Sequence, residues 1–286
     1  MTPLFSYVDC EVHVLPPEWC RSTFRPPADE TVINRKFYDH PERDIALRGA
    51  HETALLAEMD RSGITGAIIM GLPWVSPELC WRNNDYVAEL VKRHPRRFWG
   101  AGLLPSPEAE NASDAVKRIA DMGLRGVKVI PSWQGWRLDD QRFALALETI
   151  EAQRMFLEPH TDYSFTPQEV GDPQSALFTV LRRHPGLRVV APHLAGMLCL
   201  HAMHAPFRDI FRNVLLVGSV PTTMRFIEFA VAAAGAENIA FGSDFPFNPS
   251  HDQVSVRESF ERLDLSDRDK ELIAGQNALR FLKSCH

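Results

Sequence analysis

Eight short runs of β-branched, aromatic and other apolar residues recur along the chain, and their spacing constrains the fold more than any other feature. Each run is closed by Gly, Pro, Ser or a polar residue, which is typical of buried parallel strands. From the second run on, successive runs start 25 to 33 residues apart, the length that a strand, a helix and two short loops require. The predicted strands are 5–14, 65–71, 98–105, 126–132, 155–161, 188–194, 214–220 and 239–245.

Segments with helical periodicity separate these strands. The predicted helices are 50–62, 83–94, 108–122, 141–153, 174–184, 222–234 and 267–283. Strict alternation of strands and helices predicts an α/β fold, a closed (β/α)8 TIM barrel in preference to a doubly wound open sheet. No linker-like stretch divides the 286 residues, so we predict a single domain over 1–286. Residues 15–49 are predicted to be a long loop over the barrel mouth, and a loop of that length is usually functional.

Charge and cysteine content narrow the classes of function. The net charge of −6 and the lack of a basic cluster argue against nucleic acid or membrane surfaces as partners. The stretch 189–207 lacks Asp, Glu, Lys and Arg but holds three histidines and two prolines, which fits a strand that leads into a site rather than a membrane span. Five cysteines without a CxxC pair, and a start without a basic leader, predict a reduced, cytoplasmic protein.

Polar residues cluster where the predicted strands end. In a (β/α)8 barrel these ends converge on one mouth, where the reacting groups lie. Asp9, Glu11 and His13 are spaced by two along the first strand and therefore share one side of it. The other strand-end residues are Glu158, His160, His193, Ser243 and Asp244, and Lys128 lies within the fourth strand.

Four of these residues form a set suited to a divalent metal ion. Glu11, His13, His160 and Asp244 offer two carboxylates and two imidazoles, and such a mixture suits zinc, manganese or iron. Burying these groups without a cation would leave like charges together in a low dielectric. We therefore predict one divalent ion per chain, or two if further side chains contribute.

At these residues the sequence resembles the amidohydrolase superfamily. It is most similar to the amidohydrolase-related (type 2) family, the subgroup of aminocarboxymuconate-semialdehyde and resorcylate-type decarboxylases. The motifs that carry the resemblance span the chain: DCEVHV, GVKVIP, EPHT, APHLAG, FGSDFPF and GQNALRFL. The resemblance implies metal ligands at the four residues above, with His193 as a polarising or proton-shuttling histidine or a further ligand. It also implies that Lys128 is either a carboxylated ligand of a second ion or a partner of a nearby carboxylate.

One position departs from the superfamily pattern. The usual first histidine of HxH is Glu11 here. A carboxylate is a harder and more negative ligand than imidazole, so it shifts the preference from zinc toward manganese or iron. It also weakens the ion as a Lewis acid.

Three functions remain open at this level. The first is hydrolysis or non-oxidative decarboxylation of an organic acid or acyl substrate, with Asp244 moving the proton and His193 polarising a carbonyl. The second is a non-haem iron or di-iron monooxygenase on the same barrel, which hydroxylates an apolar acid or its CoA thioester. The third is a metal-free binding barrel.

Aromatic residues after two strands suggest how a small-molecule substrate is bound. Trp74 and Trp81 follow the second strand, while Trp133, Trp136 and Arg137 follow the fourth. Together they offer an aromatic wall for a planar body and a guanidinium for a carboxylate or phosphate. The alternative is that the aromatic rings cover the barrel rim. The sequence is also compatible with a homo-oligomer.

Overall fold

A computed structural model describes residues 5–40, 47, 49–161, 173–219, 224–247 and 252–285. It contains eight parallel strands in the order β1 to β8, each paired with the next. The strands are β1 (Tyr7–His13), β2 (Ile64–Met70), β3 (Phe98–Leu103), β4 (Gly126–Val129), β5 (Phe156–Pro159), β6 (Arg188–Ala191), β7 (Val214–Val217) and β8 (Ile239–Ala240).

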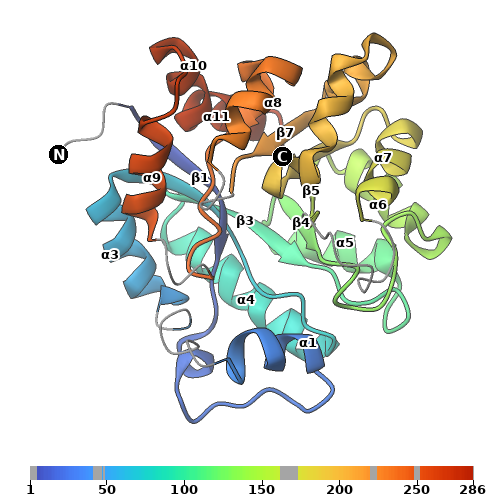
Figure 1. Ribbon diagram of the computed structural model, residues 1–286. Helices are drawn as coiled ribbons and strands as arrows, with labels where there is room; N and C mark the ends of the chain where they lie inside the picture. The colour runs from blue at the N-terminus through green and yellow to red at the C-terminus, as the bar shows by residue number, and fades with distance from the viewer. Residues whose placement is uncertain are drawn as a thin grey trace.

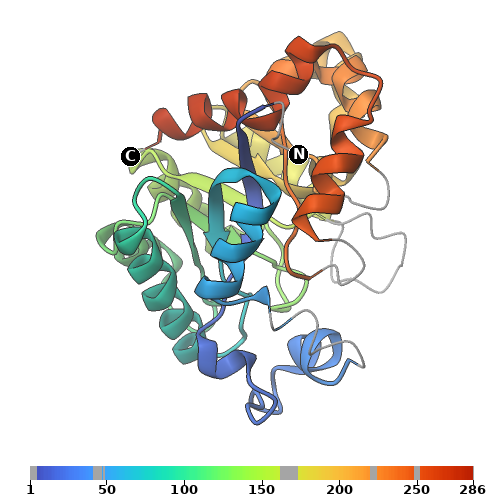
Figure 2. The same ribbon diagram turned by 90° about the vertical axis from the view of Figure 1, so that its left-hand side faces the viewer.

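The first strand returns to the last and closes the barrel. The Cys10 amide donates to the Phe241 carbonyl at 2.9 Å, and the His13 amide donates to the Phe245 carbonyl at 2.8 Å. Helices surround this cylinder in both ribbon views (Figures 1 and 2). The prediction of a (β/α)8 TIM barrel is confirmed.

The helices follow the strands as the alternation predicted. The main helices are α3 (Glu52–Ser62), α4 (Pro77–Arg93), α5 (Ala112–Asp121), α6 (Ala144–Ala152), α7 (Pro173–Arg183), α8 (Phe226–Ala234), α9 (Gln253–Glu261), α10 (Asp267–Glu271) and α11 (Asn277–Lys283). Short 3-10 or π turns are η3 (Gln141–Phe143), η4 (Pro192–Met203), η5 (Ala205–Phe211), η7 (Ala236–Asn238) and η8 (Leu272–Gln276). Of the nine main helices, five begin at a capping side chain in the described part of the chain; Asn111 accepts from the Asp114 amide, for example. Within the described ranges, no helix is long and apolar enough to span a bilayer.

Several predicted boundaries were wrong at the carboxyl ends of strands. The last predicted strand, 239–245, is regular only over Ile239–Ala240, because its remaining residues leave the sheet to form the site. Helix α9 was not predicted. Residue 220 and residues 222–223, the ends of a predicted strand and helix, lie outside the described residues.

The segment 15–49 differs from the loop that the sequence predicted. It contains η1 (Pro17–Cys20), α1 (Thr31–Ile33) and η2 (Asn34–Tyr38). Trp19 packs edge-on against Trp74, with ring centroids 5.1 Å apart, and both are fully buried. This anchor to the loop after β2 explains why the segment is folded; its residues 41–46 and 48 lie outside the described part. Figure 2 shows the segment at the end of the barrel toward which β1 runs.

The end of β3 depends on a side chain of α4. The buried amide of Asn84 donates to the Leu103 carbonyl at 2.9 Å and accepts from the Leu103 amide at 2.6 Å. We expect Asn84→Leu to lower the free energy of unfolding by about 2–4 kcal/mol, because two buried backbone groups lose their partners. Chemical denaturation measures this loss. Asp85→Ala, at the exposed neighbouring position, should change stability by less than about 0.5 kcal/mol; equal effects would contradict the assignment.

Candidate metal centre

The carboxylate of Glu11 lies at the centre of the predicted site. It is fully buried at the end of β1. One of its oxygens and ring nitrogens of His160 and His193 lie within 4.8 Å of one another, and Glu11, His13 and Asp244 form a second such group. The structure thus brings all five side chains together as two trios that share Glu11.

Two histidines are oriented by backbone carbonyls. Nδ1 of His13 lies 2.9 Å from the Gly71 carbonyl, and Nδ1 of His193 lies 2.8 Å from the Ser219 carbonyl. Because a carbonyl only accepts, each Nδ1 carries a proton and each Nε2 is the ring nitrogen that faces the site. Nε2 of His13 lies 3.3 Å from Asp244 Oδ1, and Nε2 of His193 lies 3.8 Å from Glu11 Oε1. This is the orientation that metal-binding histidines adopt.

Below the histidines, Lys128 lies between two carboxylates. Its Nζ is 3.3 Å from Glu11 Oε1 and 3.2 Å from Glu158 Oε1, and all three side chains are fully buried. Burial disfavours the charge on Glu11, but the positive charges of His193, Lys128, His13 and His160 lower its pKa to about 2. Burial raises the pKa of Glu158 to about 8, against the attraction of Lys128. Glu11 is therefore the carboxylate that stays ionised.

Two observations fit a divalent cation at this place. Oε2 of Glu11 and Oε2 of Glu158 are buried and, among the described residues, accept no hydrogen bond, which is costly for a carboxylate oxygen. Glu11 stays ionised without access to water, and the carboxylate of Asp244 lies in the same cluster. A divalent ion would offset this negative charge.

Asp9 fixes the turn that presents Asp244. Its buried carboxylate accepts from the Ser243 amide at 2.9 Å, from the Ser243 hydroxyl, from Gln253 Nε2 at 2.8 Å and from the Glu11 amide at 3.2 Å. Asp244 itself has a left-handed backbone, with φ of 57°, and such strain persists where surrounding contacts enforce it. The Asp9 bonds supply these contacts, because they join β1, the end of β8 and α9.

Three aromatic rings link the two sides of this centre. Phe247 lies 5.0 Å from the ring of His13, and Phe37 lies 4.3 Å from Phe247. Trp133 lies 6.0 Å from Phe37 and 5.9 Å from the ring of His160. We call Phe37, Trp133 and Phe247 the aromatic arch. They come from the segment 15–49 and from the loops after β8 and β4, so tertiary structure alone brings them together.

The other residues predicted to bind substrate lie elsewhere. Trp74 packs against Trp19, Trp81 donates to Glu110 at 2.9 Å, and Trp136 packs on Phe143. Arg137 pairs with Asp139 at 2.8 Å and is partly exposed. Within the described residues, none of these four has a ring contact with the site histidines, whereas Trp133 does.

The sequence also matches a family model. The model for the family described as amidohydrolase covers residues 8–283, nearly the whole chain. The chain belongs to the amidohydrolase family. The predicted family is confirmed.

Known relatives of this amidohydrolase are decarboxylases. It is 22% identical over 96% of its length to 2-amino-3-carboxymuconate-6-semialdehyde decarboxylase of Dictyostelium discoideum, covering 91% of that protein. Its fold matches 5-carboxyvanillate decarboxylase of Sphingomonas paucimobilis with a TM-score of 0.75, 19% identity and coverage of 98% and 99% of the two chains. The enzyme of the same name from Novosphingobium aromaticivorans, solved with manganese and 4-hydroxy-3-methoxy-5-nitrobenzoic acid, matches with a TM-score of 0.76, 17% identity and coverage of 98% and 96%. These findings support the predicted hydrolase or decarboxylase over the oxygenase and the metal-free barrel.

Lys128 is expected to stabilise the amidohydrolase by neutralising buried carboxylates. Lys128→Met should lower the free energy of unfolding of the metal-free protein by about 3–5 kcal/mol, because a buried ion pair loses its cation. Adding Glu158→Gln should recover part of that loss, since one of the two carboxylates then disappears. Urea denaturation measures both effects.

The matched control is Lys117→Met on the surface. Lys117 pairs with Asp114 at 2.9 Å, but both side chains are more than half exposed. Its loss should therefore cost less than about 1 kcal/mol. A double variant no more stable than Lys128→Met alone would refute the pairing argument.

Proposed function

We propose that this amidohydrolase is a divalent-metal-dependent enzyme that removes CO2 from a planar organic acid without an oxidant. The observation that carries the proposal is the shared carboxylate of Glu11, which takes part in two ligand trios and has a buried oxygen without a hydrogen-bond partner among the described residues. The decarboxylase relatives favour loss of CO2 over hydrolysis. No described feature specifically favours the oxygenase.

Each polar residue has a proposed task. Glu11, His13, His160 and Asp244 would hold the ion, and His193 would face it beside Glu11. When bound, the ion supplies positive charge that holds the substrate carboxylate and stabilises the negative charge left as CO2 departs. The Asp244 side chain is 27% exposed whereas Glu11 is sealed, so Asp244 is the carboxylate that can reach substrate and move a proton. As an ammonium, Lys128 keeps Glu11 ionised. Its contacts with Glu11 and Glu158 support an ion-paired lysine rather than a carboxylated one.

The finer assignments of metal and setting are also proposals. Manganese or iron suits the carboxylate in place of the usual first histidine. Both ligand trios found among the described residues share Glu11, which favours one ion. The five cysteines are free, which supports a reducing, cytoplasmic setting. We further propose that the chain forms a single domain, that its substrate is a small molecule and that it does not bind nucleic acid.

Metal and CO2 measurements test the function. We expect protein stripped with chelator and reloaded with manganese to release CO2 under nitrogen from 5-carboxyvanillate or another planar acid that has an oxygen beside its carboxylate. Activity that requires both dioxygen and a reductant would overturn the proposal in favour of the oxygenase. Protein that takes up no divalent ion would overturn it in favour of the binding barrel.

His160→Ala should remove both bound metal and activity, because a neutral imidazole ligand is lost. Elemental analysis after reloading measures the metal. His184→Ala is the matched control, since this histidine lies at the end of α7, 4.0 Å from Glu151. Unchanged metal content in His160→Ala would exclude His160 as a ligand.

The aromatic arch is expected to bind the flat body of the substrate. Trp133→Ala should raise KM about tenfold, equivalent to about 1.4 kcal/mol, because a stacking surface is lost. Trp133→Phe should recover most of the effect, and metal content should stay unchanged in both. Steady-state kinetics check this, with Trp81→Phe as the control. A KM unchanged in Trp133→Ala would remove the arch from substrate binding.

A further inference from the structure

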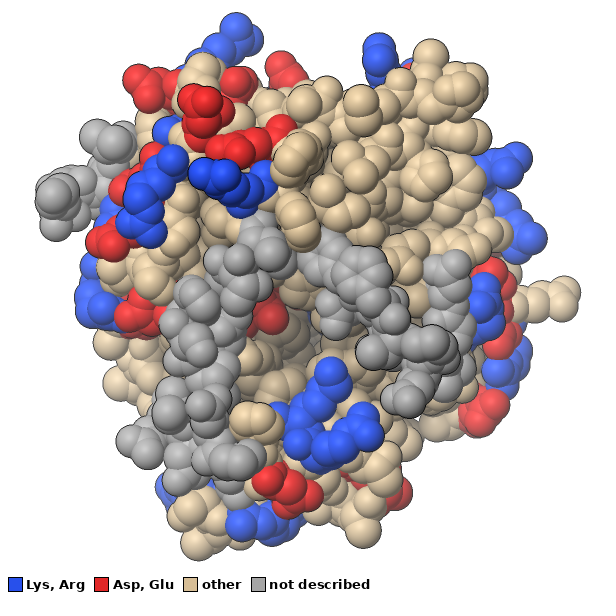
Figure 3. Space-filling view, in the orientation of Figure 1, with Lys and Arg blue, Asp and Glu red and all other residues tan. Residues whose placement is uncertain are grey.

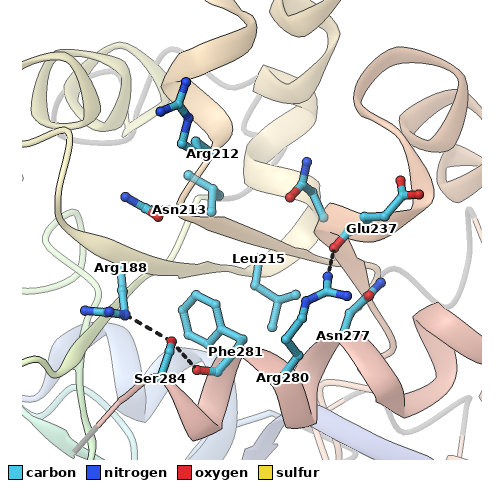
Figure 4. A pocket seen from close by; sticks show the side chains of 11 residues that line it. Arg188, Arg212, Asn213, Leu215, Glu237, Asn277, Arg280, Phe281 and Ser284 are labelled. Carbon is cyan, nitrogen blue, oxygen red and sulfur yellow. Dashed lines mark hydrogen bonds between the residues drawn. The ribbon is translucent and has the colours of Figure 1, made fainter.

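A hollow lies at the opposite end of the barrel from the metal centre. It has a volume of about 190 Å³ and lies between the amino ends of β6, β7 and β8 and helix α11. Figure 4 shows Phe281 and Leu215 between Arg188 on one side and Arg280 on the other, with Arg212 above them. In barrels of this class the chemistry is at the carboxyl ends of the strands, so this hollow is not part of the candidate active site.

The two arginines beside the apolar floor keep hydrogen-bonding capacity. Arg188 Nε donates to the Ser284 hydroxyl at 3.0 Å, and Arg280 donates to the Glu237 carbonyl at 2.6 Å. Each guanidinium has five N–H groups, so most remain available. Across the described ranges, neither arginine forms a salt bridge with a carboxylate. Arg61, by contrast, pairs with Glu58 and Asp252.

Further positive charge gathers around the same helix end. Arg125 donates to the Leu282 carbonyl at 3.3 Å. Burial raises the pKa of Cys285, whereas the charges of Arg188, Arg125 and Arg154 act in the opposite direction. Arg188, Arg280 and Arg125 thus gather at this end of α11 in a protein whose net charge is −6, and positive charge attracts anions. On the face of the molecule that Figure 3 shows, Lys and Arg lie beside acidic residues in several places.

The lining also contains apolar surface. The ring of Phe281 and the side chain of Leu215 form an apolar floor, and Asn213 and Asn238 also line the hollow. Glu237 is the single acidic residue among those that line the hollow. A flat apolar body would pack on the floor, and anionic groups at its two ends would face the guanidinium groups.

We propose that this hollow binds a small acid that carries two anionic groups on a flat apolar body. Arginine suits either carboxylate or phosphate, because its planar fork matches both in a bidentate manner. The bound acid bridges β6, through Arg188, to helix α11, through Arg280. Binding therefore stabilises the folded barrel and raises its Tm.

Isothermal titration of the full chain with terephthalate tests the site, with benzoate and inorganic phosphate as comparison probes. We expect one terephthalate per chain, bound at least tenfold more tightly than either comparison probe. Arg188→Gln and Arg280→Gln should each weaken terephthalate binding about tenfold, whereas Arg280→Lys should weaken it less. Circular dichroism of each variant verifies that it is folded.

Two controls separate this site from the metal centre. Arg268→Gln removes the same charge from the exposed helix α10, and His160→Ala alters the other end of the barrel; both should bind terephthalate like the unaltered protein. The proposal is overturned if terephthalate shows no saturable binding, if the Arg188 and Arg280 variants bind it normally, or if His160→Ala abolishes binding. Equal affinity for inorganic phosphate would overturn the role of the apolar floor.

Discussion

The sealed carboxylate of Glu11 is the constraint on which the rest of the site depends. It has no access to water, so its charge must be compensated inside the barrel. Lys128 compensates it from below, while His13 at the end of β1, His160 just after β5 and His193 just after β6 face it from the mouth. One carboxylate oxygen is left without a partner among the described residues. A divalent cation, as we propose, would satisfy both the charge and this oxygen.

Hydrogen bonds hold the side chains that surround the site. Backbone carbonyls of Gly71 and Ser219 set the tautomers of two histidines, and Asp9 joins three elements beneath the turn that holds Asp244. The aromatic arch adds a flat apolar surface beside these polar groups. The barrel thus separates functions along its axis: the carboxyl ends of its strands hold the candidate chemistry, and the amino ends hold an arginine-lined hollow next to the last helix.

Much of this could be predicted because strand ends converge in a closed barrel. Glu11, His160 and Asp244 are distant in sequence, but each follows a recognisable apolar run. Phe37 and Phe247 were missed, because nothing in the sequence of a loop indicates where its side chains point. Glu158 and Asp9 were seen at strand ends but received no role, since a partner such as Gln253 comes from a helix that the periodicity did not reveal.

The sequence by itself determined the eight-fold alternation, the family and the chemical types of the site residues, because periodicity and motifs are local properties of the chain. Tertiary structure alone decided that Lys128 faces two carboxylates, that Trp19 of the segment 15–49 packs against Trp74, and that three distant rings form one arch. These facts depend on the registers of eight strands and on the directions of loops. Contacts between remote segments set both, and no single stretch of sequence encodes them.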